Sequence, residues 1–144
     1  MNVLTCMREF KVPNLVFSSS CTVYGQADVL PVTEKTPRHE AESPYGNTKV
    51  MSEDIIRDLM RVEPDMKALA LRYFNPIGAH PTAFIGELPN GVPNNLIPYL
   101  TQTAIGIREQ LSVFGDDYNT PDGSPLRDYI DVVDLCLLDP SYAA

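Results

Sequence analysis

The sequence predicts an α/β protein in which a parallel β-sheet has helices packed on both of its faces. Short uninterrupted apolar runs, such as residues 15–17, are typical of strands that are buried on both sides. Apolar residues at helical spacing lie between these runs, and the two patterns alternate along the 144 residues. Such alternation favours a parallel sheet, in which ligands bind outside the carboxyl ends of the strands.

The first 43 residues are expected to form a helix, a strand and a loop. Residues 1–10 place four apolar side chains at helical spacing, and Pro13 ends this pattern. The run 15–17 then predicts a buried strand, which leads into three consecutive serines. Residues 25–43 are polar and contain prolines, which predicts a long surface loop.

The next helix is expected to begin after Ser43, with this serine as the N-cap and Pro44 at the first helical position. It should end at Glu63, because a proline follows. An apolar stripe at helical spacing assigns three of its residues to the core: Met51, Ile55 and Leu59.

The remaining elements are expected to be three strands, one helix and two loops rich in Gly, Pro and Asn. The strands are 68–74, 111–114 and 127–132, the loops are 78–95 and 115–125, and the helix carries Ile97, Leu100, Ala104 and Ile107 on one face. Three polar or aromatic residues lie at the ends of expected strands, namely Ser20, Asn75 and Phe114. We expect them to share the ligand-binding edge of the sheet.

The composition argues against several classes of function. A net charge of −8 and the lack of a basic stripe argue against nucleic acid as a partner. The three cysteines and two histidines are far apart, so we expect neither a metal site nor a disulfide framework, and a reducing cytoplasm is the usual environment. No apolar run approaches the roughly 18 residues that a membrane span requires.

The main chemical signal is the pair Tyr45 and Lys49 at the start of the helix that follows Ser43. Residues four apart share a helix face, so we expect the phenol and the ammonium group to be neighbours. An adjacent cation favours phenolate and lowers a tyrosine pKa of about 10, which makes Tyr45 a usable general base. The Ser20 hydroxyl could hydrogen-bond a substrate oxygen or relay its proton. A surface lysine beside a half-buried tyrosine is the alternative that this spacing leaves open.

Beyond these patterns, the chain resembles the UDP-galactose (UDP-glucose) 4-epimerases of the extended short-chain dehydrogenase/reductase superfamily over nearly all of residues 3–135. The matching blocks follow the family's order: Leu15-Val-Phe-Ser-Ser-Ser-Cys-Thr-Val-Tyr-Gly25, Ser43-Pro-Tyr-Gly-Asn-Thr-Lys49, Leu71-Arg-Tyr-Phe-Asn-Pro-Ile-Gly-Ala-His80, Gly91-Val-Pro-Asn-Asn-Leu-Ile-Pro-Tyr99, and Val113-Phe-Gly-Asp-Asp-Tyr118 with Arg127-Asp-Tyr-Ile130. The resemblance implies a partial Rossmann-like, doubly wound sheet. Residues 1–76 would form the C-terminal part of the NAD-binding domain, and residues 77–144 the start of a small UDP-sugar-binding lobe.

The resemblance also implies a reaction, the interconversion of UDP-galactose and UDP-glucose in galactose metabolism with tightly bound NAD. Tyr45 would take the proton of the sugar 4-hydroxyl while a hydride leaves C4 for the nicotinamide and later returns to the other face of the 4-ketose. Ser20 matches the hydroxyl at the sugar oxygen, and Lys49 matches the residue that binds the nicotinamide ribose. These three residues would be catalytic and would also contact NAD, with Tyr73 near the nicotinamide.

The same resemblance implies a set of substrate-binding residues: Ser20, Thr22, Tyr45, Asn75, Asn95, Ser112, Phe114 and Arg127. Thr22 would lie beside the sugar, the two asparagines would hold the UDP portion, Ser112 and Phe114 would line the uracil, and Arg127 would meet the diphosphate. The residues alone leave other readings open. Asn95 could cap a helix, Phe114 could belong to the core, and Arg127 could form a surface ion pair with Asp128.

The chain departs from the family pattern in ways that keep a second function open. Residues 20–23 lack the Asp-Glu pair of the related 4,6-dehydratases, which disfavours dehydration. None of the eight glycines forms the G-x-x-G or G-x-G-x-x-G turn that seats a pyrophosphate, Asp131 replaces a usual histidine, and the C-terminal substrate segment is missing. We therefore expect residues 1–144 to bind NAD weakly. The alternative is a catalytically inactive fragment with at most a structural or interaction role.

The resemblance carries one further expectation about partners. Full-length members of the family are expected to form homodimers through the helix that bears Tyr45 and its neighbour.

Overall fold

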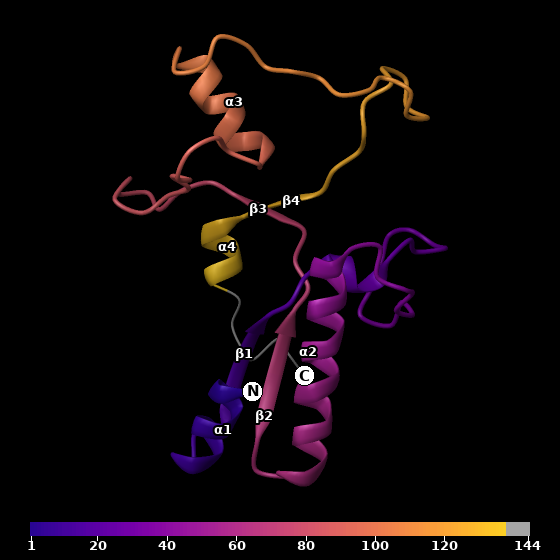
Figure 1. Cartoon of the computed structure of the whole chain (residues 1–144), viewed down its shortest axis with the longest axis vertical. Coiled ribbons are helices and arrows are strands. Elements are labelled where there is room, and N and C mark those ends of the chain that lie inside the picture. The colour runs from indigo at the N-terminus through magenta and orange to yellow at the C-terminus, as the bar shows by residue number, and fades with distance from the viewer. Residues whose placement is uncertain (138–144) are drawn as a thin grey trace. The chain divides into compact units, whose positions relative to one another are not determined.

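The computed structural model of the chain describes residues 1–137, which divide into two compact units (Figure 1). The first unit comprises residues 1–74, and the second begins at Asn75. Each unit contains its own pair of parallel strands. The predicted α/β class with parallel strands is confirmed, whereas the expected single sheet is replaced by two separate strand pairs in the described residues.

The first unit is built from two strands and the helices around them. In chain order it contains α1 (Asn2–Glu9), β1 (Asn14–Ser18), the 3-10 helix η1 (Cys21–Tyr24), α2 (Pro44–Val62) and β2 (Lys67–Leu71). β1 and β2 pair in parallel from Asn14 opposite Lys67 to Ser18 opposite Leu71. Figure 1 shows α2 running beside this pair as the crossover between its strands. The expected loop over residues 25–43 is confirmed.

The start of α2 confirms the expected capping. The Ser43 Oγ accepts a hydrogen bond of 3.1 Å from the Gly46 amide, and Pro44 occupies the first turn, where its missing N–H costs nothing. Gly46 is buried against η1, because a Cβ added there would lie 3.4 Å from the Thr22 Cβ. This close approach brings the first turn of α2 onto the segment that follows Ser20.

The buried face of α2 differs from the stripe that was assigned to the core. Ile56 and Glu53 are buried, whereas Met51 and Ile55 are 55% and 40% exposed, so their assignment to the core was wrong. Leu59 is half-buried. The reason is that apolar residues occur on two faces of α2, and the strand pair lies against the face that carries Ile56.

The strands of the first unit are covered on one side only. Phe17 lies on the side of α2, together with Ala68 and Ala70 of β2. Side chains alternate across a strand, so Val16 points to the opposite face, where it is 61% exposed. The expectation that residues 15–17 are buried on both faces was therefore wrong for the described residues.

The second unit contains shorter elements and more irregular chain. Its elements are β3 (Asn75–Ile77), α3 (Leu96–Ala104), β4 (Tyr129–Asp131) and α4 (Val132–Cys136), and β3 pairs with β4 in parallel. The expected strand 127–132 is confirmed in its central part. The expected strand 111–114 was wrong, because these residues are irregular and have no paired strand. The expected helical face also ends earlier, at Ala104, which leaves Ile107 outside α3.

Candidate functional site

Tyr45 and Lys49 lie on one face of the first two turns of α2. The Lys49 Nζ is 5.4 Å from the centroid of the Tyr45 ring and equally far from that of Phe17. It also donates a hydrogen bond of 2.8 Å to the carbonyl oxygen of Ser18, the last residue of β1. Tyr45 is 57% exposed, so its phenol is accessible to a ligand while the lysine anchors the helix to the strand.

Ser20 and Thr22 are held by the turn of chain that leaves β1. Ser20 is 8% exposed, and its Oγ caps η1 by accepting a hydrogen bond of 3.3 Å from the Thr22 amide. The Thr22 Oγ1 is buried and has no hydrogen-bond partner among the described residues. Because buried hydroxyls normally find partners, this oxygen is a candidate for a hydrogen bond with a bound molecule.

Tyr73 connects the two strand ends of the first unit. Its hydroxyl forms a hydrogen bond with the Ser18 Oγ, and its carbonyl oxygen accepts a bond of 3.2 Å from the Cys21 amide. The structure therefore brings the residues of the first unit that were expected to contact the cofactor to the carboxyl ends of β1 and β2: Ser20, Tyr45, Lys49 and Tyr73.

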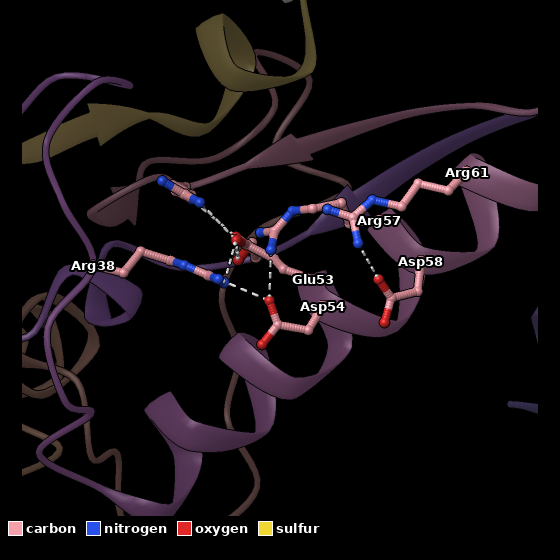
Figure 2. A network of polar contacts seen from close by, with 8 residues as sticks. Arg38, Glu53, Asp54, Arg57, Asp58 and Arg61 are labelled. Carbon is pink, nitrogen blue, oxygen red and sulfur yellow. Dashed lines mark hydrogen bonds and ion pairs between the residues drawn. The ribbon is translucent and has the colours of Figure 1, made fainter.

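A network of charged residues next to these groups was not predicted from the sequence. Glu53, which is 5% exposed, accepts hydrogen bonds of 2.9 and 2.6 Å from Arg72 and one of 2.6 Å from the Ser19 hydroxyl. Figure 2 shows Arg38 reaching toward Glu53 and the neighbouring Asp54, at 3.5 and 2.7 Å. Glu53 could have been found from its spacing, because residues 45, 49 and 53 repeat every four positions.

This network keeps Glu53 ionised. Burial raises the pKa of Glu53, but hydrogen bonds from Arg72 and Ser19, together with the positive charges of Arg72 and Arg38, outweigh it, so the pKa lies below its usual value of 4.5. The hydrogen bond to Glu53 in turn raises the pKa of the Arg72 guanidinium above its usual value. The result is a buried ion pair that is fully charged at neutral pH.

In the second unit, three of the residues expected to bind UDP line one pocket of about 400 Å³. Asn95, Ser112 and Phe114 surround it together with Pro93, Asn94, Leu96, Tyr99 and Leu111. The Arg108 guanidinium lies over the Tyr99 ring, 4.7 Å from its centroid. Neither residue was expected in the site from the sequence: Tyr99 entered only as the last residue of a matching block, and Arg108 lies beyond the end of α3 in no motif.

The other expected contacts of the second unit are engaged elsewhere. The Asn75 side chain donates a hydrogen bond of 2.8 Å to the carbonyl oxygen of Asp128, which ties the start of β3 to the chain before β4. Arg127 donates to the carbonyl oxygen of Leu126 and does not line the pocket. Asn95 precedes α3 but makes no side-chain cap, and its side-chain Nδ2 donates to the Glu87 Oε1 at 2.7 Å.

No group of three or more His, Cys, Asp or Glu side chains is placed to hold a metal ion within residues 1–137. None of the helices there combines the length and apolar character needed to cross a membrane.

The sequence is similar to that of a known protein family and of its curated members. Residues 1–138 match the profile of the NAD dependent epimerase/dehydratase family. A UDP-glucose 4-epimerase of Mus musculus is 56% identical over 135 residues, which are 94% of this chain and 39% of that protein. A UDP-glucose 4-epimerase of Dictyostelium discoideum is 54% identical with the same coverage.

The fold of this chain is similar to that of a solved structure of the same family. The solved structure is a UDP-glucose 4-epimerase from Bifidobacterium longum in complex with NAD⁺ and UDP, with a TM-score of 0.87 and 48% identity. The match covers 92% of this chain and 39% of that one, so the chain spans about two fifths of the length of these relatives.

Proposed function

The chain belongs to the NAD-dependent epimerase/dehydratase family, and we propose that it serves the NAD-dependent epimerisation of a UDP-hexose at C4, interconverting UDP-galactose and UDP-glucose. The observation that carries this proposal is the pairing of Tyr45 with Lys49. A phenol that is accessible, with an ammonium group 5.4 Å from its ring, is suited to removing a proton from a sugar hydroxyl.

We assign a proposed role to each of the three central residues. Tyr45 takes the proton of the 4-hydroxyl and returns it after the ketone has been reduced on its other face. Lys49 stabilises the phenolate electrostatically, and its hydrogen bond to Ser18 holds the ammonium group in place. Ser20 donates its hydroxyl proton to the sugar oxygen, since the bond from the Thr22 amide uses one lone pair of its Oγ and leaves the O–H free to donate.

The donors present at the strand ends fit a ligand rich in hydroxyl groups. Lys49 has three N–H donors, one of which is used by Ser18, and the buried Thr22 Oγ1 has no partner among the described residues. Lys49 would hold the nicotinamide ribose of NAD, Tyr73 would lie near the nicotinamide, and Ser20 and Tyr45 would also contact the cofactor. When bound, NAD would accept the hydride from C4 and return it.

The pocket of the second unit is proposed to bind the uracil nucleotide of the substrate. Phe114 supplies an aromatic face, and Asn95 and Ser112 supply polar groups that can pair with a uracil or a ribose. Arg127 is proposed to meet the diphosphate, since a guanidinium fork matches phosphate oxygens and, within residues 1–137, its side chain is engaged by a neighbouring carbonyl oxygen alone. Asn75 is proposed to contribute through the side-chain oxygen that its bond to Asp128 does not use.

A turnover assay tests the proposal. The chain is incubated with UDP-galactose and millimolar NAD, and UDP-glucose is quantified, both alone and with the part of the mouse relative that lies outside the 135 aligned residues. We expect turnover in the supplemented mixture, and a reduction of roughly 10²- to 10⁴-fold when Tyr45→Phe removes the base. Tyr118→Phe is the matched control, because Tyr118 is a tyrosine exposed in the second unit.

The possible results separate the candidate functions. Equal activity of the Tyr45→Phe and Tyr118→Phe proteins would exclude Tyr45 as the base. UDP binding without turnover in either mixture would instead leave a nucleotide-binding or scaffold role.

We also propose that α2 contributes to a homodimer. Its outer face exposes three apolar side chains, Met51, Ile55 and Val62, which are 55%, 40% and 72% accessible. Such a stripe is more typical of a protein interface than of a solvated helix. Light scattering coupled to size exclusion should give twice the chain mass, and Ile55→Glu should return it to the single-chain mass.

A further inference from the structure

Glu53 is a buried carboxylate outside the set of residues that would touch substrate or cofactor. Its side chain is 4% exposed and is satisfied by Arg72 and Ser19, with Arg38 at 3.5 Å. Figure 2 shows that it points from α2 toward Arg38, whereas Asp58 and Arg61 pair with each other farther along the same helix. Burying a charge costs free energy unless the charge is fully paired. The burial of the Glu53 carboxylate therefore calls for a structural role that a solvated surface charge would not need.

The position of Glu53 on α2 continues the stripe of Tyr45 and Lys49. Residues four apart lie above one another on a helix. Lys49 and Glu53 each form a hydrogen bond at the point where the chain leaves β1. Lys49 donates to the carbonyl oxygen of Ser18 at 2.8 Å, and Glu53 accepts from the hydroxyl of Ser19 at 2.6 Å. α2 is therefore hydrogen-bonded to both of the residues that directly precede Ser20.

Arg72, the second partner of Glu53, connects α2 to the end of β2 as well. Arg72 is bound through two hydrogen bonds, and the residue that follows it, Tyr73, accepts from the Cys21 amide. The Arg72 guanidinium also lies 4.9 Å from the ring centroid of Tyr24, at the end of η1. The Glu53–Arg72 pair thus contacts Ser19, before η1, and Tyr24, at the end of η1. η1 begins at the residue after Ser20.

We propose that Glu53 is a positioning residue that fixes Ser20 and Tyr73 relative to the Tyr45 and Lys49 side chains on its own helix. The catalytic meaning of this role rests on the function proposed above, whereas the geometric role does not. One carboxylate joins α2 to both strand ends, so a change at this single side chain is transmitted to the Ser20 hydroxyl without any contact with a ligand.

Amide hydrogen exchange, followed by NMR on the full chain, tests the geometric role. The amides of Cys21 and Thr22 report on the segment, since they donate to Tyr73 and to Ser20. In Glu53→Gln we expect their exchange to accelerate by about tenfold or more relative to the β1–β2 ladder, as expected from the loss of a charge-assisted hydrogen bond. Asp58→Asn, which removes an exposed ion pair of the same helix, should leave this ratio unchanged.

A second variant keeps the test decisive if Glu53→Gln folds poorly. Ser19→Ala removes one hydrogen bond of the network and leaves Glu53 paired with Arg72. It should accelerate the same two amides by a smaller factor. Uniform acceleration throughout residues 1–74 would mean that Glu53 only stabilises the unit, and unchanged exchange in both variants would mean that it does neither; each result overturns the proposal.

Turnover in the supplemented mixture separates this proposal from the proposed function. If the chain is active, Glu53→Gln should lower kcat with little change in KM, because substrate contacts remain while the acid–base geometry is disturbed. A fall in kcat no greater than that of Asp58→Asn would overturn the positioning role. If the unaltered chain shows no turnover, the proposed function fails, and the exchange ratio still decides whether Glu53 holds the strand ends.

Discussion

Replacing Glu53 by Gln should destabilise the first unit more than any other single change of charge on α2. The substitution keeps the shape of the side chain but removes the charge that accepts two hydrogen bonds from Arg72 and lies 3.5 Å from Arg38. Breaking a buried ion pair typically costs 3–5 kcal/mol, because it leaves the partner charge uncompensated. The arginine side chains are 21% and 24% exposed, so water reaches them and we expect the lower end, about 3 kcal/mol.

Urea unfolding at pH 7, followed by far-ultraviolet circular dichroism, measures this loss of the free energy of unfolding. The control is Asp58→Asn, whose ion pair with Arg61 is 71% exposed on both sides and should contribute less than about 1 kcal/mol. A double variant, Glu53→Leu with Arg72→Met, should recover a large part of the loss, because it removes both charges together. If Glu53→Gln costs no more than Asp58→Asn, the reasoning from burial is refuted.

The remaining predictions concern pH, a glycine, the small core and the nucleotide pocket. Because the pKa of Glu53 in the folded chain lies below its usual 4.5, its contribution to stability is complete above pH 4.5 and is lost as the pH falls through the lowered pKa. In Glu53→Gln the free energy of unfolding should therefore lose this dependence on pH. An unchanged pH profile would contradict the lowered pKa. Gly25→Ala should cost about 2 kcal/mol or more in urea unfolding, because Gly25 has φ +58° and an added Cβ would lie 2.6 Å from the Glu40 carbonyl oxygen; a loss below half of that would show that the loop can move aside. Ile56→Ala should lower the free energy of unfolding by about 2 kcal/mol, the lower end for a buried isoleucine. Ile56 already borders a cavity of about 210 Å³, so its truncation removes fewer contacts than it would in a dense core. Equal stability of the variant and the parent chain would argue against this core. Phe114→Ala should weaken the binding of UDP by roughly tenfold in calorimetry, as expected for the loss of one aromatic stacking partner, whereas Phe84→Ala, at a similarly exposed phenylalanine outside the pocket, should not.

The sequence predicted the local parts of this protein well where a short stretch of chain carries the cause. Ser43 and Pro44 start α2 because an N-cap hydroxyl and a proline in the first turn act within one turn of helix. The proximity of Tyr45 and Lys49 also follows from helical geometry alone, since four residues make roughly one turn. The family match agrees with the resemblance seen in the five sequence blocks.

The sequence could not predict features that depend on which surfaces meet. Apolar residues lie on two faces of α2, and only the position of the strand pair decides that Ile56 is buried while Met51 is exposed. Residues 111–114 have the composition of a strand, but a strand forms only when a partner supplies its hydrogen bonds, and none pairs with them among the described residues. The same limit applies to the pocket, which joins residues 93–99 to residues 111–114.

Sequence and tertiary structure therefore contribute different parts of the candidate site. The sequence by itself determined the types of chemical group, the helix start that presents Tyr45 and Lys49, and the family, because these depend on residue identity and local spacing. The tertiary structure alone decided that Glu53 is buried, that it joins Ser19 to Arg72, and that Phe114 borders a pocket with Asn95. The physical reason is that burial and long-range pairing are properties of two surfaces in contact, and a linear pattern describes only one surface at a time.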